Sequence, residues 1–192
     1  SKGMALNELR NTAYHEGGHA LVAAALHNTD PVTKVTILPR GRALGYTAVM
    51  PTTDRYSQSR NELLDQMAYA MGGRVAEEIV FLDPSTGAAN DIQKATDVAR
   101  KMVTEYGMSS RIGAVRLVGD DSDPFSTGGM AGGGVRHSDV VTSQVDEEIR
   151  ELIDVAHDEA WQIVVDNMDI LDTLAHRLLE KETVLQPELD EI

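Results

Sequence analysis

The sequence predicts a mainly α-helical fold with a small β-hairpin near residues 32–50 and a helical hairpin at the C-terminal end. Several long stretches place apolar residues three and four positions apart, which is typical of amphipathic helices. Between residues 32 and 50, β-branched residues alternate instead, which indicates two short strands. At 192 residues the chain is long enough to bury a sizeable core, and we expect a single domain.

The first predicted element of the chain is a helix over residues 6–25. Helical periodicity stops there, ahead of the helix-breaking segment Asn28-Thr29-Asp30-Pro31. The two strands are expected at 32–38 and 43–50, where β-branched and aromatic residues recur. The turn Pro39-Arg40-Gly41 separates them, so the two strands should pair as a hairpin.

Two further helices are predicted in the middle of the chain. The first covers residues 57–79, because Ser59 and Glu62 form a capping-box signature ahead of a periodic apolar face. A loop over 83–87 follows, since proline, glycine and small polar residues cluster there. The next helix is expected over 89–106, with one apolar face directed inward.

The C-terminal part divides into a loop and two helices. Residues 119–138 contain three aspartates, a proline and two runs of glycine, and they are expected to form a mobile loop. Helices are predicted over 138–165 and 168–179, together an antiparallel helical hairpin. We therefore expect three parts within the single domain: a core over 1–118, the glycine-rich loop over 119–138, and acidic helices over 139–192.

Charge is distributed unevenly along the chain. The net charge is −14, and residues 139–192 hold 16 acidic against 3 basic residues. We interpret this acidity as the solvated face of long helices, and the alternative is repulsion or steering at an assembly surface. Nucleic-acid binding is disfavoured in either case, because phosphate contacts require a basic surface.

Other classes of site are excluded by what the sequence lacks. It contains no cysteine, so disulfides and thiolate metal sites are ruled out, and any metal must be held by histidine and carboxylate. No apolar run approaches the ~20 residues that cross a bilayer, and the first residues do not resemble a signal peptide. No phosphate-binding G-x-x-x-x-G-K-[ST] motif occurs. We expect a soluble segment without direct membrane contact.

The most informative motif is His15-Glu16-Gly17-Gly18-His19, inside the first predicted helix. Four residues make about one helical turn, so both imidazoles lie on one face and can bind one metal ion. Glu16 is then placed to act on a water molecule as a general base. The two glycines conflict with a helix, because each costs about 1 kcal/mol relative to alanine. The alternative is a pair of surface histidines, with glycines that serve close packing.

A catalytic zinc ion needs a third protein ligand. The candidates are His27, Glu77, Glu78, Asp91, Asp97 and His137. His27 lies two turns beyond the motif, too far to share its ion, and His137 borders the predicted mobile loop. Spacing does not choose among the others. Either glutamate can pair with Arg74 instead, and Asp91 suits the first turn of a helix for dipole reasons alone.

A family resemblance narrows this choice. The segments that carry it are Thr12-Ala13-Tyr14-His15-Glu16-Gly17-Gly18-His19-Ala20, Ile37-Leu38-Pro39-Arg40-Gly41, Leu44-Gly45-Tyr46-Thr47, Gly72-Gly73-Arg74-Val75-Ala76-Glu77-Glu78 and Ser85-Thr86-Gly87-Ala88-Ala89-Asn90-Asp91. In this order they resemble the peptidase domain of the FtsH family, the membrane-anchored ATP-dependent zinc proteases of the AAA class. The resemblance covers residues 5–118 closely, implies Asp91 as the third zinc ligand, and differs at Gly17, where the family usually has alanine.

The resemblance implies a zinc-dependent endopeptidase that cleaves unfolded or flexible polypeptides. Zn²⁺ held by His15, His19 and Asp91 would lower the pKa of water, and Glu16 would accept the proton. Family members contribute to protein quality control and work as hexamers, so we expect a homo-oligomer. Their ATPase module and membrane anchor are not recognised in these 192 residues, and the full-length protein is expected at the cytoplasmic side of the bacterial inner membrane or the corresponding organelle membrane.

The predicted second strand offers a binding edge for substrate. Its residues Leu44, Gly45, Tyr46 and Thr47 are candidates for contact with an extended peptide, and Gly45 would permit close approach of the backbone. The alternative is a self-contained hairpin. Two other functions remain open: a catalytically silent assembly platform, against which the intact His-Glu pair counts, and a metallohydrolase that acts on small molecules.

Overall fold

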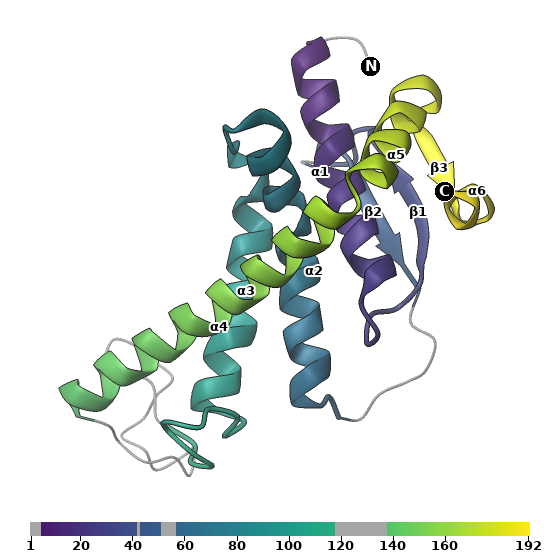
Figure 1. The fold of residues 1–192 in the computed structure, drawn as a ribbon. Helices are drawn as coiled ribbons and strands as arrows, with labels where there is room; N and C mark the ends of the chain where they lie inside the picture. The colour runs from purple at the N-terminus through teal and green to yellow at the C-terminus, as the bar shows by residue number, and fades with distance from the viewer. Residues whose placement is uncertain (1–4, 42, 51–56, 118–137) are drawn as a thin grey trace.

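The computed structural model describes residues 5–41, 43–50, 57–117 and 138–192. Helices dominate this part of the chain, so the mainly α-helical prediction is confirmed (Figure 1). The helices are α1 (Leu6–Ala25), α2 (Arg60–Phe81), the 3₁₀ turn η1 (Thr86–Ala88), α3 (Ala89–Thr104), α4 (Asp139–Asp166), α5 (Met168–Lys181) and α6 (Gln186–Glu191). The strands are β1 (Val32–Thr36), β2 (Tyr46–Val49) and β3 (Thr183–Leu185). None of the described helices combines the length and the apolar character that a bilayer crossing requires.

Helix α1 occupies the centre of the molecule. Helix α2 packs along one side of it, the sheet lies on the other, and α5 crosses it (Figure 1). Every residue from Thr12 to Ala23 is therefore buried. The helix ends at Ala25, as the breaking segment predicts, and His27 lies beyond it. Because α1 is buried on all sides over this stretch, it needs no polar face toward water. Its sequence is therefore less amphipathic than that of α3.

The glycines of the HEGGH motif are explained by this packing. A Cβ atom on Gly18 would overlap the carbonyl oxygen of Gly72, and one on Gly72 would lie 2.8 Å from the carbonyl oxygen of Gly18. The backbones of α1 and α2 thus touch where the two helices cross. On the other side, a Cβ on Gly17 would lie 3.1 Å from Cδ1 of Leu171 in α5. Close packing offsets the helix-propensity cost of these residues.

The starts of the next two helices follow their capping chemistry. Ser59 caps α2, and its hydroxyl accepts from the backbone N–H of Glu62 at 3.1 Å, so the serine half of the predicted capping signature is confirmed. The helix begins at Arg60 rather than at the predicted residue 57. Helix α3 begins at Ala89 as predicted and ends two residues early, at Thr104. The inward-facing residues expected on it include Ala95 and Ala99, which are buried.

Two of the three strands were predicted. β1 and β2 pair antiparallel, within the expected ranges but shorter, since β2 begins only at Tyr46. β3 was not predicted, and it pairs antiparallel with β1 to give the order β2-β1-β3. It has three residues, too few for a recognisable alternation. Its position leaves β2 at one edge of the sheet.

The predicted C-terminal helical hairpin is wrong. Helix α4 packs against α2 and α3, whereas α5 packs against α1, and the two helices run onward instead of folding back (Figure 1). Asn167 alone joins them, which is too short a connection for an antiparallel reversal. The helices themselves lie where predicted, with Ser138 as the N-cap of α4. The loop prediction for residues 119–137 falls outside the described residues.

A polar contact fixes α5 on the central helix. The Tyr14 hydroxyl of α1 donates to Asp172 Oδ1 of α5 at 2.8 Å. Burial and this hydrogen bond raise the pKa of Tyr14 to about 12, so the phenol stays a donor at neutral pH. Directly beside Tyr14 in the sequence is His15, so α5 supports the helix turn that carries the motif.

Candidate metal centre

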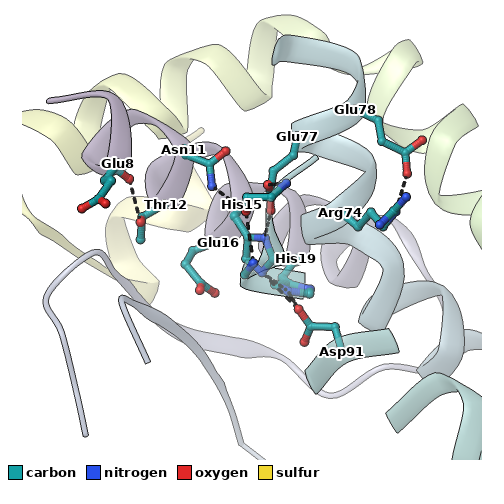
Figure 2. Close-up of polar contacts among 12 residues, drawn as sticks. Glu8, Asn11, Thr12, His15, Glu16, His19, Arg74, Glu77, Glu78 and Asp91 are labelled. Carbon is teal, nitrogen blue, oxygen red and sulfur yellow. Dashed lines mark hydrogen bonds and ion pairs between the residues drawn. The ribbon is translucent and has the colours of Figure 1, made fainter. Parts of the chain in front are cut away.

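Three side chains from two helices meet at one point. Nε2 of His15, Nε2 of His19 and Oδ2 of Asp91 lie 3.1 Å from one another in all three pairs (Figure 2). Both histidines are buried, and Asp91 stands in the first turn of α3. Ligands about 2.1 Å from a tetrahedral zinc ion lie roughly 3.4 Å apart. The donor types and their spacing therefore fit a zinc ion.

The outer ring nitrogens fix how the two histidines are oriented. Nδ1 of His19 donates to the backbone carbonyl of Tyr69 at 2.8 Å. Nδ1 of His15 lies 2.6 Å from Oε2 of Glu77, which accepts as a carboxylate. Because each Nδ1 carries the proton in the neutral ring, each Nε2 presents a lone pair toward the other and toward Asp91. In this neutral state three electron-rich atoms face one another, and they repel one another unless a metal ion or a proton lies among them.

Electrostatics at this point favour a positive charge. Burial alone would lower the pKa of His15, but hydrogen bonds from the protonated ring to Asp91 and Glu77 outweigh burial and raise the pKa to about 10, so a proton on Nε2 can take the place of a metal ion. For Asp91, burial raises the pKa, yet the hydrogen bonds with His15 and His19 hold it below its usual value. The carboxylates thus stay ionised beside the histidines, and the net field suits a bound cation.

Glu77 lies behind the cluster instead of within it. Its side chain on α2 is fully buried, and its second oxygen accepts from the backbone N–H of Ser85 at 2.8 Å. Burial raises the pKa of Glu77, but the hydrogen bonds from His15 and Ser85 outweigh it and lower the pKa. Glu77 was one of the candidate ligands, and the structure places it on the outer nitrogen of His15, where it orients the ring.

Gly73 leaves room for the two imidazoles, a role that the sequence did not reveal. A Cβ atom at this position would lie 2.5 Å from Nε2 of His15 and 2.6 Å from Nε2 of His19. No side chain larger than hydrogen fits there without moving both rings. The neighbouring glycine, Gly72, serves the helix crossing, so the Gly72-Gly73 pair has two separate functions on two faces of α2.

Glu16 lies beside the cluster and faces the cleft (Figure 2). Its Oε1 accepts from the hydroxyl of Thr47 at 3.0 Å, and the same hydroxyl lies 3.1 Å from the backbone oxygen of Glu16. Thr47 on β2 therefore holds one carboxylate oxygen. No hydrogen bond from another described residue reaches the second oxygen, Oε2, which can therefore contact a molecule in the cleft.

The cleft has a volume of about 1090 Å³, and His15, Glu16, His19 and Asp91 all line it. The predicted substrate-binding residues Leu44, Gly45, Tyr46 and Thr47 line it as well, along the free edge at β2. Close packing also explains the glycine at position 45, because a Cβ atom there would lie 2.6 Å from the backbone oxygen of Thr36. Its presence is therefore no sign of substrate contact by itself.

Glu78, adjacent to Glu77 in the sequence, faces a different partner. Its carboxylate accepts from Arg74 at 2.8 Å, and Nε2 of His157 on α4 lies 3.2 Å away. The pairing with Arg74 follows the alternative that the sequence left open. This pair links α2 to α4 and has no contact with the three-residue cluster among the described residues.

The remaining candidate ligands lie elsewhere. His27 is exposed beyond the end of α1, and the Asp97 carboxylate accepts from Gln93 on the outer face of α3 at 2.9 Å. His137 lies outside the described residues. Among the residues that the structure describes, His15, His19 and Asp91 form the one group of three or more potential ligands.

The fold and this site are those of a helical metallopeptidase class, and comparison with known proteins agrees. The model of peptidase family M41 matches residues 3–192, so the chain belongs to this family. It is 58% identical over 182 residues to the ATP-dependent zinc metalloprotease FtsH of Cutibacterium acnes (strain SK137). The matched region covers 94% of this chain and 25% of that protein.

Other relatives carry the same name. The identity is 51% with the protein of Mycobacterium leprae (strain TN), over 96% of this chain and 23% of the relative. It is 47% with that of Syntrophobacter fumaroxidans (strain DSM 10017 / MPOB), over 98% of this chain and 30% of the relative. The family resemblance predicted from the motifs is confirmed. The chain spans about a quarter of the length of the curated relatives it matches.

Proposed function

We propose that this chain is the proteolytic part of an ATP-dependent zinc protease, a zinc-dependent endopeptidase that cuts unfolded or flexible polypeptides. The observation that carries the proposal is the mutual 3.1 Å spacing of His15, His19 and Asp91 beside Glu16 in one cleft. The printed names of the relatives, ATP-dependent zinc metalloproteases, support the same metal and reaction.

Each residue of the site has a defined task in this proposal. His15, His19 and Asp91 hold the ion, while Glu77 and the Tyr69 carbonyl orient the two rings. Bound zinc acidifies water and polarises the carbonyl of the scissile bond. Oε2 of Glu16 accepts the proton of the attacking water and then delivers it to the leaving amine. Thr47 keeps the Glu16 carboxylate turned toward the cleft during both transfers.

The free edge of the sheet is the proposed binding site for substrate backbone. β2 has a partner only on its β1 side within the described sheet, so its other side can receive an extended peptide as an added strand. Leu44, Gly45, Tyr46 and Thr47 lie along this edge. A long cleft of about 1090 Å³ suits a polypeptide better than a small molecule, which favours the protease over a small-molecule metallohydrolase.

Further proposals concern the full-length protein. The family relation favours an assembly of identical subunits, a hexamer, that is joined to an ATPase and anchored at the cytoplasmic side of a membrane. Such an assembly would serve protein quality control. Within this chain we propose a catalytic core over residues 1–118 and an acidic C-terminal unit over 139–192, separated by the glycine-rich segment.

Digestion of unstructured casein tests the proposal. The zinc-loaded chain should cut casein, and a chelator should stop cleavage. Glu16→Gln should lower the rate by about 100-fold or more, because it removes the general base while it preserves shape and zinc content. Casein cleavage that is equal in wild type and Glu16→Gln would refute the role of Glu16. Absence of cleavage by zinc-loaded wild type would favour the silent assembly platform.

A further inference from the structure

Three residues of α2 form a row that faces α1 at the candidate metal centre. Tyr69, Gly73 and Glu77 follow one another at intervals of four positions, so they lie on one face of the helix. Glu77 contacts the outer nitrogen of His15, and Gly73 leaves room for both imidazoles. The backbone carbonyl of Tyr69 accepts from Nδ1 of His19. The main chain of Tyr69 thus orients a candidate ligand, and its phenol is available for a second task.

The phenol of Tyr69 lies beside the candidate metal centre. Its ring centroid is 5.4 Å from that of His19, and the two rings are tilted by 50°. Tyr69 lines the cleft, as Glu16 and Asp91 do. Burial raises the pKa of Tyr69, and the negative charges of these two carboxylates raise it further. The hydroxyl therefore lies within electrostatic reach of both carboxylates, and it keeps its proton at neutral pH.

The Tyr69 hydroxyl forms no hydrogen bond with another residue that the structure describes. The side chain is half-buried, and a phenol with limited access to water normally has a partner for its O–H group. Tyr14 shows this usual arrangement, because its hydroxyl donates to Asp172 at 2.8 Å. For Tyr69, the partners that remain are molecules in the cleft, which are water in the free protein and a peptide in the complex with substrate.

We propose that Tyr69 is a catalytic residue whose hydroxyl donates a hydrogen bond to the carbonyl oxygen of the scissile bond, and this inference rests on the proposed function. That oxygen gains negative charge when water adds to the carbonyl carbon, so the donor stabilises the transition state more than the bound substrate. The charges of Glu16 and Asp91 oppose such a build-up, and a neutral donor offsets part of this repulsion. Tyr69 keeps its proton throughout, and Glu16 remains the residue that transfers protons.

Removal of the hydroxyl alone tests this inference. Tyr69→Phe keeps the ring beside His19 and the carbonyl that orients it, so zinc content should equal that of wild type. Both zinc-loaded proteins are compared on one internally quenched peptide, with kcat and KM measured separately. Because a bound zinc ion polarises the same oxygen, kcat should fall by about 10- to 100-fold, less than for a sole donor, while KM stays within about twofold.

Tyr106→Phe is the matched control. Tyr106 is half-exposed just after the end of α3 and does not line the cleft, so this variant loses the same atom at a distant place. Its kcat and KM should equal those of wild type. A loss of kcat as large as that in Tyr69→Phe would contradict a local role of the Tyr69 hydroxyl.

Two inhibitors with the sequence of that peptide give a readout that is independent of turnover. A phosphinic peptide carries tetrahedral oxygens in place of the reacting carbonyl, whereas a reduced-amide peptide carries a methylene group there and no oxygen. Tyr69→Phe should weaken binding of the phosphinic peptide by about tenfold or more and leave binding of the reduced-amide peptide unchanged.

The outcomes separate this inference from the proposed function. An unchanged kcat in Tyr69→Phe, equal losses of affinity for the two inhibitors, or loss of zinc from the variant would overturn the inference alone, because wild type still cuts the peptide. Failure of zinc-loaded wild type to cut any flexible peptide would overturn the proposed function, and the inference with it.

Discussion

Two adjacent glutamates on α2 each meet a histidine, and the two pairs differ in every physical respect. Glu77 is fully buried and lies 2.6 Å from Nδ1 of His15, with a backbone N–H of Ser85 on its other oxygen. Glu78 is partly exposed and lies 3.2 Å from His157, which stacks on the half-exposed Trp161. The first pair faces α1 and the candidate metal centre, and the second faces α4.

The difference teaches that the surroundings, and not the residue types, decide what a His–Glu contact does. When a buried pair loses one partner, the other is left as a polar group or a charge that water cannot reach, which is costly. A buried pair therefore keeps a fixed geometry and a fixed protonation state. At the surface, water replaces a lost partner, and an ion pair contributes about 0–1 kcal/mol. Changes on the α1 side of α2 should therefore disturb zinc binding, whereas those on the α4 side should not.

The largest effect is expected for Gly73→Ala. Its methyl group would lie 2.5 Å from Nε2 of His15 and 2.6 Å from Nε2 of His19, so the rings must move apart and the ion loses its site. Zinc content after equilibration should fall far below one ion per chain. The control is Gly17→Ala, whose new Cβ would lie 3.1 Å from the end of the Leu171 side chain and 3.7 Å from that of Leu174, away from the imidazoles, and which should keep its zinc. Full zinc occupancy in Gly73→Ala would contradict the steric role.

A smaller effect is expected for Glu77→Gln. The amide can donate where the carboxylate only accepts, so His15 would shift its proton to Nε2, the atom that faces Asp91. Zinc affinity should drop by about 10- to 100-fold, as measured by competition with a chelating dye. Glu78→Gln is the matched control, one residue away with the same chemical change, and its affinity should equal that of wild type. Equal affinities in the two variants would remove the distinction between the pairs.

The smallest effect is expected for His157→Ala. The contact with Glu78 is partly exposed, and Arg74 remains as a partner for that carboxylate at 2.8 Å. The free energy of unfolding should fall by less than about 1 kcal/mol in urea titrations, and zinc affinity should not change. A loss of several kcal/mol would show that the α4 side of α2 is as sensitive as the buried side.

Sequence reasoning was most successful where short-range geometry decides. One helical turn between His15 and His19 placed both rings together, and the serine cap at Ser59 marked the start of α2 within a few residues. It failed on β3, which has three residues and exists because β1 offers it an edge. It also failed on the helical hairpin, because the apolar faces of α4 and α5 find partners that lie far away in the sequence.

From the sequence alone it follows that His15 and His19 share one face of a helix, that a metal ligand must be histidine or carboxylate because the chain has no cysteine, and that the chain resembles the FtsH family. Only the tertiary structure placed Glu77 behind His15 and turned Glu78 toward α4, and it brought Asp91, the ligand that the resemblance implies, to the two histidines. Asp91, Glu77 and Glu78 are chemically alike, and spacing along the chain does not separate them. The close crossing of α1 and α2 at Gly18 and Gly72 brings one face of α2 against His15, so Glu77 lies on that face and Glu78 on the face toward α4.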